Sequence, residues 1–268
     1  MAKVCILIIL GTGLLGCSVG FKRFIWFLSV GYGLAMSCIA AALIVLSLVT
    51  KTWSIPYLML CAVIFVYGLR LGLFLLVRET KNKEYRKTLE SAGGEKEMKF
   101  PIMFSMWLMN GGLFLMQSSP LYYRIQNIAR GDAKAESVFL WIGFAISLGG
   151  LVIEAVSDAQ KSAQKKENPK MVATKGLFKL CRCPNYFGEI LVWTGVLVSG
   201  IPVLRGWQWL IAAIGYIAIV YIMFNGAKRL ETRQTKRCWK MPEYVEYANK
   251  TPIIIPFLPI YHLIDWRQ

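Results

Sequence analysis

Residues 54–77 read SIPYLMLCAVIFVYGLRLGLFLLV, a stretch in which Arg70 is the only charged side chain. About 20 consecutive apolar residues are enough for a helix to cross the hydrocarbon core of a bilayer. A soluble domain of this chain length would show shorter apolar segments. The stretch therefore predicts a transmembrane helix, and it decides the class of fold.

Similar apolar runs recur along the whole chain of 268 residues, which is 56% hydrophobic with a mean hydropathy of +0.49. No alternation of period two suggests a barrel, and open sheets cannot face lipid. We therefore predict an all-α polytopic membrane protein with seven transmembrane helices in one membrane domain, residues 1–268. The spans are predicted at 4–20, 24–49, 54–77, 100–122, 137–157, 190–204 and 207–224. The first run also resembles a signal sequence that could be cleaved.

The positive charge of the chain predicts its orientation. The formal net charge is +16, and most of the 31 Lys and Arg residues lie at 22–23, 78–99, 161–182 and after 224. Since cytoplasmic loops are enriched in Lys and Arg, we predict the N-terminus outside and the C-terminus in the cytoplasm. The basic residues lie in short loops and not along one face, which favours contact with membrane lipids and no nucleic-acid partner.

Two sequence patterns resemble ligand sites but do not indicate one. GTGLLG at residues 11–16 matches a dinucleotide fingerprint, but that site needs an acidic residue about 20 positions later. The first acid is Glu79, so these small residues are expected to pack helices. The seven cysteines and the single histidine, His262, lack the spacing of a zinc site, and we predict no metal. His262 is also far along the chain from the polar motifs described below.

Arg70 is an ionisable residue inside a predicted span. Such a residue is costly in hydrocarbon and faces the bundle interior or a wet cavity. It lies too far from the end of the span for easy snorkelling. Tyr67 precedes it by three residues and shares its helical face. We favour a functional role for both residues over a structural ion pair.

Glu154 and Asp158 lie one turn apart at the end of the fifth predicted span, with Lys161 and Lys165 continuing the same face. Carboxylates near a helix C-terminus oppose the helix dipole and need compensation. Pairing with the two lysines would provide it. A ligand with hydroxyl and phosphate groups would provide it equally well, and the spacing leaves both interpretations open.

The motif CRCPNYFGEI, residues 181–190, precedes the sixth apolar run. Pro184 is favoured at the first position of a helix. Glu189 gains from the positive end of the helix dipole, and Gly188 permits close backbone approach. Asn185 offers both a donor and an acceptor. We predict a helix that begins at Pro184, with Asn185 aimed into the bundle.

Together with EAVSDAQK (154–161) and EYVEYANKTPIIIPFLP (243–259), this motif resembles the C-terminal domain of the steroid 5-alpha-reductase superfamily. The resemblance covers residues 140–260 and is closest to a bacterial-type membrane branch of poorly characterised members. In the N-terminal half it is carried by the seven spans and by the face that holds Tyr67 and Arg70.

The resemblance implies an NADPH-dependent membrane reductase that acts on an activated carbon–carbon double bond in an apolar lipid or steroid-like substrate. Tyr67 would be the catalytic residue, with its hydroxyl hydrogen-bonded to the substrate carbonyl. The residues implied to contact or support the cofactor are Arg70, Glu154, Asp158, Lys165, Asn185, Glu189 and Tyr247.

Two departures from the family pattern keep alternatives open. The usual R-H-P triplet reads Arg182, Cys183 and Pro184 here, and no acid precedes Glu79. A first alternative is therefore a non-catalytic structural subunit that binds other subunits of a membrane complex. The motif core also resembles isoprenylcysteine and phospholipid methyltransferases. A second alternative is therefore an S-adenosylmethionine-dependent membrane methyltransferase.

Overall fold

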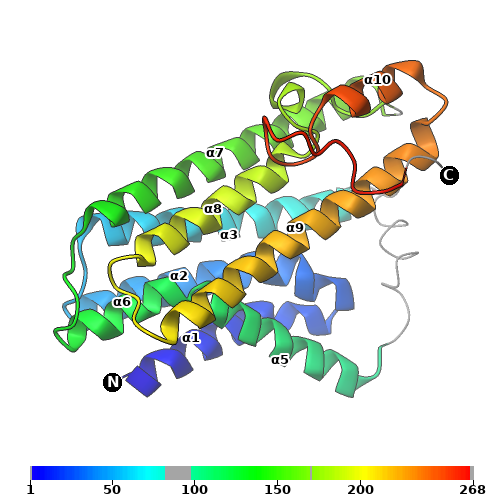
Figure 1. Ribbon diagram of the computed structural model, residues 1–268. Coiled ribbons are helices and arrows are strands. Elements are labelled where there is room, and N and C mark those ends of the chain that lie inside the picture. Colours follow the sequence, from blue (N-terminus) through cyan, green and yellow to red (C-terminus); the bar gives the residue numbers. More distant parts are fainter. Residues whose placement is uncertain (1, 82–97, 170, 266–268) are drawn as a thin grey trace. The chain divides into compact units, whose positions relative to one another are not determined.

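The computed structural model describes residues 2–81, 98–169 and 171–265 (Figure 1). Within these ranges every regular element is a helix, which confirms the all-α prediction. The α-helices are α1 Ala2–Cys17, α2 Val30–Val49, α3 Ile55–Lys81, α5 Phe100–Gln117, α6 Ser119–Ala129, α7 Val138–Glu167, α8 Pro184–Gly200, α9 Gln208–Cys238 and α10 Pro242–Lys250. Short 3-10 helices are η1 Ser18–Phe21, η2 Phe24–Leu28 and η4 Gly176–Lys179.

Four of the described helices, α2, α3, α7 and α9, are long and apolar enough to cross a membrane. Their length and composition support an integral membrane protein. The number of seven spans and the orientation of the termini stay predictions.

Two predicted spans are divided in the structure. The segment 24–49 breaks at Ser29, whose backbone lies outside the helical region at φ −125° and ψ −95°. The segment 100–122 ends as a helix at Gln117, and Pro120 lies in the first turn of the next helix, α6. Proline is well tolerated there because its missing N–H would have no helical partner. Hydropathy alone does not reveal either of these helix breaks.

Two other helices continue beyond their apolar runs. The run predicted at 137–157 becomes α7, which ends at Glu167, and the run at 207–224 becomes α9, which ends at Cys238. The added residues are rich in Lys, Arg, Glu and Gln, which are good helix formers. A hydropathy boundary therefore marks the end of the apolar part and not the end of the helix.

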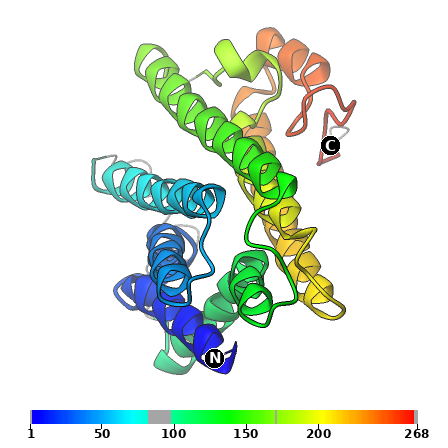
Figure 2. The same ribbon diagram turned by 90° about the vertical axis from the view of Figure 1, so that its left-hand side faces the viewer.

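The chain divides into two compact units. Unit 1 comprises Met1–Ala145 and Gly195–Tyr216, and unit 2 comprises Ile146–Thr194 and Ile217–Gln268. Within unit 1, α2 packs against both α1 and α3, and Figure 2 shows these three helices in dark blue to cyan.

Glycines allow α2 and α3 to approach at backbone distance. A Cβ added at Gly33 would lie 2.5 Å from the Gly68 carbonyl oxygen, and one added at Gly68 would lie 2.4 Å from the Gly33 carbonyl oxygen. Neither contact tolerates a side chain. Tyr32 and Tyr67 directly precede these glycines, so the same helix contact brings the two tyrosines together.

Helix α6 contributes a fully buried polar cluster to unit 1. The Arg124 guanidinium donates to the Ser199 carbonyl oxygen at 2.7 Å. The Asn127 amide donates to the Val203 carbonyl oxygen at 2.7 Å and to the Gln208 side-chain oxygen at 2.8 Å. Gln208 donates back to Asn127 at 3.3 Å. These buried polar side chains thus join α6 to the connection between α8 and α9.

Unit 2 is built on an antiparallel contact between α7 and α8. A Cβ added at Gly150 would lie 2.5 Å from the Gly188 carbonyl oxygen. The Ser147 hydroxyl donates to the Val192 carbonyl oxygen at 2.8 Å, one turn further along both helices. These contacts set the register of the two helices in unit 2.

Two glutamines of α7 form hydrogen bonds to the segment that follows this helix. The Gln164 side-chain oxygen accepts from the backbone N–H groups of Thr174 and Lys175, both at 2.9 Å. The Gln160 oxygen accepts from Leu177 N–H at 2.9 Å. Gly176, between them, has φ +69°, and its added Cβ would lie 2.3 Å from Gln160. The position therefore requires glycine for its conformation and for its space.

Residues Lys51 and Lys240 test the predicted orientation, because both are exposed between helices and the native cysteines are mostly buried. In intact cells, a membrane-impermeant maleimide is expected to label a Lys51→Cys variant and not a Lys240→Cys variant. Labelling of both sites after the membrane is permeabilised is the control. The opposite pattern in intact cells would contradict the orientation.

Replacing Asn127 by leucine is expected to lower the free energy of unfolding by about 1–3 kcal/mol, because it leaves buried groups at Gln208 and Val203 without their partner. The melting temperature in detergent measures the effect. Asn225→Leu is the matched control, since that amide donates to the Tyr221 carbonyl oxygen at an exposed position. Equal melting temperatures for both variants would contradict a structural role for Asn127.

Candidate functional site

Tyr67 is completely buried in unit 1, where it belongs to a chain of polar side chains. Its hydroxyl donates to the Tyr32 hydroxyl at 3.0 Å, and the two rings meet edge to face. The Gln117 side-chain amide donates to the same Tyr32 hydroxyl at 3.2 Å. Three helices, α2, α3 and α5, thus contribute one polar group each. Sequence reasoning identified only Tyr67, because Tyr32 and Gln117 are close to it only in the folded chain.

Arg70 follows Tyr67 by three residues on α3 and is half-buried. Further along α3, the Arg78 guanidinium lies over the Phe74 ring, 5.4 Å from its centre. Glu79 is buried, pairs with Arg23 and accepts from the Trp26 indole N–H at 2.6 Å. These contacts fix the C-terminal end of α3, the helix that carries Arg70 and Tyr67.

In unit 2, α8 begins at Pro184, which confirms the predicted helix start. Gly188 lies against α7, where its added Cβ would be 2.7 Å from the Glu154 backbone nitrogen. In this antiparallel register, Asp158, one turn later on α7, is level with the start of α8 and with Asn185. Glu154, Asp158 and Glu189 are all buried. The packing of α7 on α8 thus brings four predicted residues to one end of this helix pair.

The Asn185 side-chain oxygen is buried and has no hydrogen-bond partner within the part of the chain that the structure describes. Burying an acceptor without a donor costs about 1–3 kcal/mol. At the start of α8 the Tyr186 and Phe187 N–H groups bond to the Cys183 carbonyl oxygen, both at 3.1 Å, and Pro184 has no N–H. The Asn185 oxygen can therefore accept a hydrogen bond from a donor group of a ligand.

Lys165 and Tyr247 are both engaged within the protein. The Lys165 ammonium donates to the carbonyl oxygens of Pro169, at 3.2 Å, and Met171. A phosphate would have to compete with these bonds. The Tyr247 hydroxyl donates to the Phe178 carbonyl oxygen at 2.6 Å, and its ring packs against the buried cluster Val172, Cys238, Tyr244 and Ala248. Helix α10 is thereby held against the 172–178 segment, and the nucleotide roles of Lys165 and Tyr247 stay predictions.

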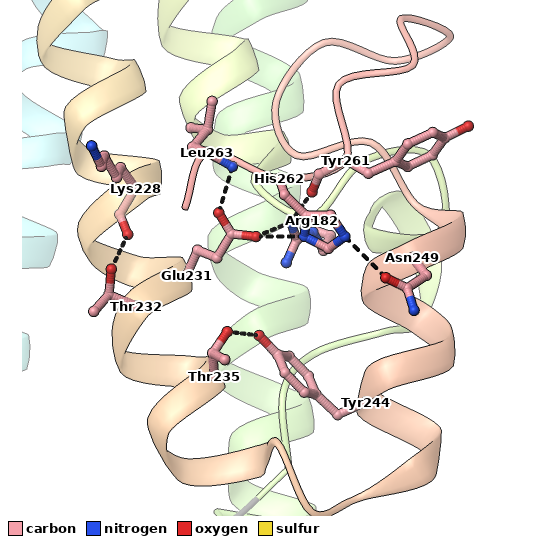
Figure 3. A network of polar contacts seen from close by, with 10 residues as sticks. All are labelled: Arg182, Lys228, Glu231, Thr232, Thr235, Tyr244, Asn249, Tyr261, His262 and Leu263. Atoms are coloured by element: carbon pink, nitrogen blue, oxygen red, sulfur yellow. Dashed lines mark hydrogen bonds and ion pairs between the residues drawn. The ribbon is translucent and has the colours of Figure 1, made fainter. Parts of the chain in front are cut away.

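A buried ionic network connects the motif to the C-terminal segment (Figure 3). The Arg182 guanidinium pairs with Glu231 of α9 at 2.7 Å, and the His262 Nδ1 lies 3.0 Å from the same carboxylate oxygen. The second oxygen of Glu231 accepts from Leu263 N–H at 2.8 Å. His262 Nε2 lies 2.9 Å from the Asn249 side-chain oxygen, which adds α10 to the network.

The position of His262 corrects the sequence interpretation. Its distance along the chain separated it from the motif, but the fold places it on the carboxylate that binds Arg182. Glu231 is the signal that could have indicated this contact, because it is a single acid within the basic segment 228–240. A lone carboxylate in such a segment needs a specific partner when it is buried.

Cys183 occupies the position where the resemblance leads one to expect histidine. Burial raises the pKa of the Cys183 thiol to about 11, so it stays protonated and uncharged near neutral pH. It cannot replace an imidazole as a proton acceptor there. The neighbouring Arg182 keeps two buried N–H groups, Nε and Nη1, without a hydrogen-bond partner in the described residues. These donors match the oxygen atoms of an anionic ligand.

Comparisons with known proteins agree with the resemblance seen in the motifs. A family model described as "Protein of unknown function (DUF1295)" matches residues 23–251. The chain is similar to steroid 5-alpha-reductase DET2 of Gossypium hirsutum, 25% identical over 179 residues, which is 65% of this chain and 61% of that protein. It is 29% identical to DET2 of Arabidopsis thaliana over 135 residues, 48% of this chain and 47% of that protein.

A mammalian relative shows the same likeness. The chain is 29% identical to the human 3-oxo-5-alpha-steroid 4-dehydrogenase 1 over 119 residues, 44% of this chain and 41% of that protein. The chain thus spans about half the length of the curated relatives it matches. No solved structure matches it.

Glu231→Ala is expected to lower the free energy of unfolding by about 3–5 kcal/mol, because it leaves the Arg182 charge buried without its counter-ion. Thermal unfolding in detergent measures this loss. Glu246→Ala is the matched control, since Glu246 pairs with Lys250 on an exposed face of α10. Its melting temperature should equal that of the wild type. A Glu231→Ala variant as stable as this control would show that the buried pair contributes nothing.

Proposed function

The chain belongs to the DUF1295 family, and from that premise we propose that it is an NADPH-dependent membrane reductase of an activated carbon–carbon double bond in a lipid or steroid-like substrate. The observation that carries the proposal is the similarity to steroid 5-alpha-reductases from two plants and to the human 3-oxo-5-alpha-steroid 4-dehydrogenase 1. The apolar helices support an apolar lipid as the substrate.

The residues of unit 2 fit the polar part of a dinucleotide. Asp158 and Glu154 can accept hydrogen bonds from ribose hydroxyls, and the unsatisfied oxygen of Asn185 can accept one more. The unpartnered N–H groups of Arg182 can donate to phosphate oxygens. Lys165 can add a positive charge if it leaves its loop carbonyls.

The other residues proposed to contact or support the cofactor are Glu189, Tyr247 and Arg70. Glu189 is buried in the first turns of α8, where we propose that it supports the residues around Asn185. Tyr247 holds α10 against the 172–178 segment. Arg70, on α3 in unit 1, stays a predicted cofactor-binding residue. When bound, NADPH supplies the hydride, and the protein orients it and excludes water.

Tyr67 is proposed to turn its hydroxyl proton from the Tyr32 oxygen to the substrate carbonyl that is conjugated with the double bond, and to donate a hydrogen bond to it. Such a bond stabilises the negative charge that develops on this oxygen as the double bond is reduced. A neutral phenol suits a buried site because it brings a donor without a charge. The chain has no early acid, but Tyr32 and Gln117 lie within hydrogen-bond distance along the same polar chain.

Binding of NADPH and of S-adenosylmethionine to the purified protein in nanodiscs separates the proposed function from its alternatives. The proposal expects saturable binding of NADPH and none of S-adenosylmethionine. The reverse preference would assign the chain to the methyltransferase class. Binding of neither would favour a non-catalytic subunit of a membrane complex.

Asp158→Ala and Asn185→Ala are each expected to weaken NADPH binding about tenfold, because each removes a buried hydrogen bond worth roughly 1.4 kcal/mol. Asn225→Ala, which removes an exposed amide from α9, is the control and should bind as the wild type does. Equal, small losses in all three variants would leave Asp158 and Asn185 with structural roles only.

A further inference from the structure

The segment that follows α10 in unit 2 forms a small closed loop with an apolar tip. The Ile253 N–H donates to the Ile260 carbonyl oxygen at 2.8 Å, which joins the two ends of this 253–260 loop. Ile253 and Ile254 are buried at its base. At its tip Phe257 is 90% exposed, more than any other large apolar side chain of the described residues, and Leu258 is exposed beside it.

The tip is a turn whose sequence does not suit its backbone. The Leu258 N–H bonds to the Ile255 carbonyl oxygen at 3.4 Å, so Pro256 and Phe257 are the two central residues of the turn. Phe257 has φ +67°. A type II turn has proline at the first central position and a positive φ at the second, where glycine or asparagine is preferred. A bulky side chain at such a φ is strained, and strain of this kind points to a function for the residue that bears it.

Arg182 holds both ends of the loop. Its backbone N–H donates to the Pro252 carbonyl oxygen at 2.8 Å, and its guanidinium donates to the Tyr261 carbonyl oxygen. The same guanidinium pairs with Glu231 of α9. Two prolines within the loop restrict its backbone further. The apolar tip is therefore carried on a fixed base, and its exposure is a property of the fold.

The contact with α9 places this base close to the apolar part of that helix. Lys228 and Arg229 are the first charged residues of α9 after its apolar run, and both are exposed. Lys and Arg concentrate at the end of a span, where the helix leaves the hydrocarbon. Glu231 follows them by less than one turn. It lies only about 10 Å along the helix axis beyond Phe224, the last residue of the predicted span.

The loop extends back toward that apolar part. From the Arg182–Glu231 pair it runs toward the end of α9 that carries Lys228 and away from Thr235 (Figure 3). The four residues that lead from the base to Phe257 span at most about 14 Å when extended. This reach exceeds the distance that separates the base from the apolar part of α9, so the tip can enter the edge of the hydrocarbon.

We propose that the 253–260 loop is an interfacial anchor, which inserts Phe257 and Leu258 into the boundary between the headgroups and the acyl chains of the bilayer. Large apolar side chains beside basic ones enter this boundary by about 5–10 Å. A bilayer fits the surface better than a second protein does, because Lys228 and Arg229 offer positive charge to lipid phosphates at the same level. Burial of the Phe257 ring in lipid also offsets the strain of its turn.

Fluorescence quenching in the purified protein, held in nanodiscs of phosphatidylcholine and phosphatidylglycerol, tests the anchor without cofactor or substrate. A nitrobenzoxadiazole maleimide labels Leu258→Cys and, as the control, Glu246→Cys on the exposed face of α10. The wild type, whose cysteines are mostly buried, gives the background. A lipid with a nitroxide on its acyl chain is expected to quench the label at 258 about threefold more than that at 246, because only the tip enters the bilayer. Iodide in the water should show the reverse order.

Two substitutions at Phe257 separate its ring from the turn. Phe257→Asn keeps a residue that tolerates a positive φ but removes the apolar ring. In the Leu258→Cys background it is expected to lower lipid quenching about threefold, while the melting temperature does not fall. Phe257→Leu keeps an apolar side chain and should retain the quenching of the parent.

Equal lipid quenching at 258 and 246 would overturn the inference, and so would strong quenching at 258 that Phe257→Asn leaves unchanged. A label at 258 that iodide reaches and the lipid nitroxide does not would also overturn it. The tip would then be a contact for another protein or for a second copy of this chain. None of these results depends on whether the protein binds NADPH, so the anchor and the proposed function stand or fall separately.

Discussion

The close approach of helix backbones at glycine is the constraint on which both candidate regions depend. In lipid there is little hydrophobic force between helices, so association relies on dense packing of small residues. The contact of Gly33 with Gly68 seats Tyr32 against Tyr67 in unit 1. The contact of Gly150 with Gly188 sets the register that brings the carboxylates of α7 level with the start of α8. A side chain at any of these glycines would separate the helices and the polar groups that they carry.

Polar side chains inside these helix bundles are of two kinds. Some are fully used by the protein, as in the Asn127–Gln208 pair and the carboxylate of Glu231. Others keep unused donors or acceptors although they are buried, and Asn185 belongs to this second group. When buried, both kinds carry a desolvation cost, but only the first kind recovers it within the chain. The second kind is where binding of another molecule gains the most free energy.

The sequence predicted the features that depend on neighbouring residues. The apolar run that contains Tyr67 gave the correct helix α3, and Pro184 gave the correct start of α8. Breaks at Ser29 and before Pro120 were not predicted, because hydropathy averages over the few residues that interrupt a helix. Helix ends were too early in α7 and α9, since charged residues continue a helix beyond its apolar part.

Contacts between distant residues were the least predictable part of the candidate site. The spacing of Glu154 and Asp158 indicated a shared face from the sequence alone, as any separation of four residues does in a helix. The meeting of Arg182, Glu231 and His262 depends on how the C-terminal segment folds back, which no local pattern records. The same holds for Gln117, whose polarity was hidden within a largely apolar run.

The carboxylate of Glu231 has a consequence for the order in which unit 2 is completed. Its oxygens bind Arg182 before α8, and His262 and Leu263 after α10, so three separate parts of the chain meet at one side chain. During synthesis the segment with His262 leaves the ribosome after α7, α8 and α9. Until it arrives, Glu231 lacks the contacts that His262 and Leu263 supply. Unit 2 therefore completes the contacts of this carboxylate only after α7, α8 and α9 have been made, when the later segment with His262 and Leu263 reaches Glu231.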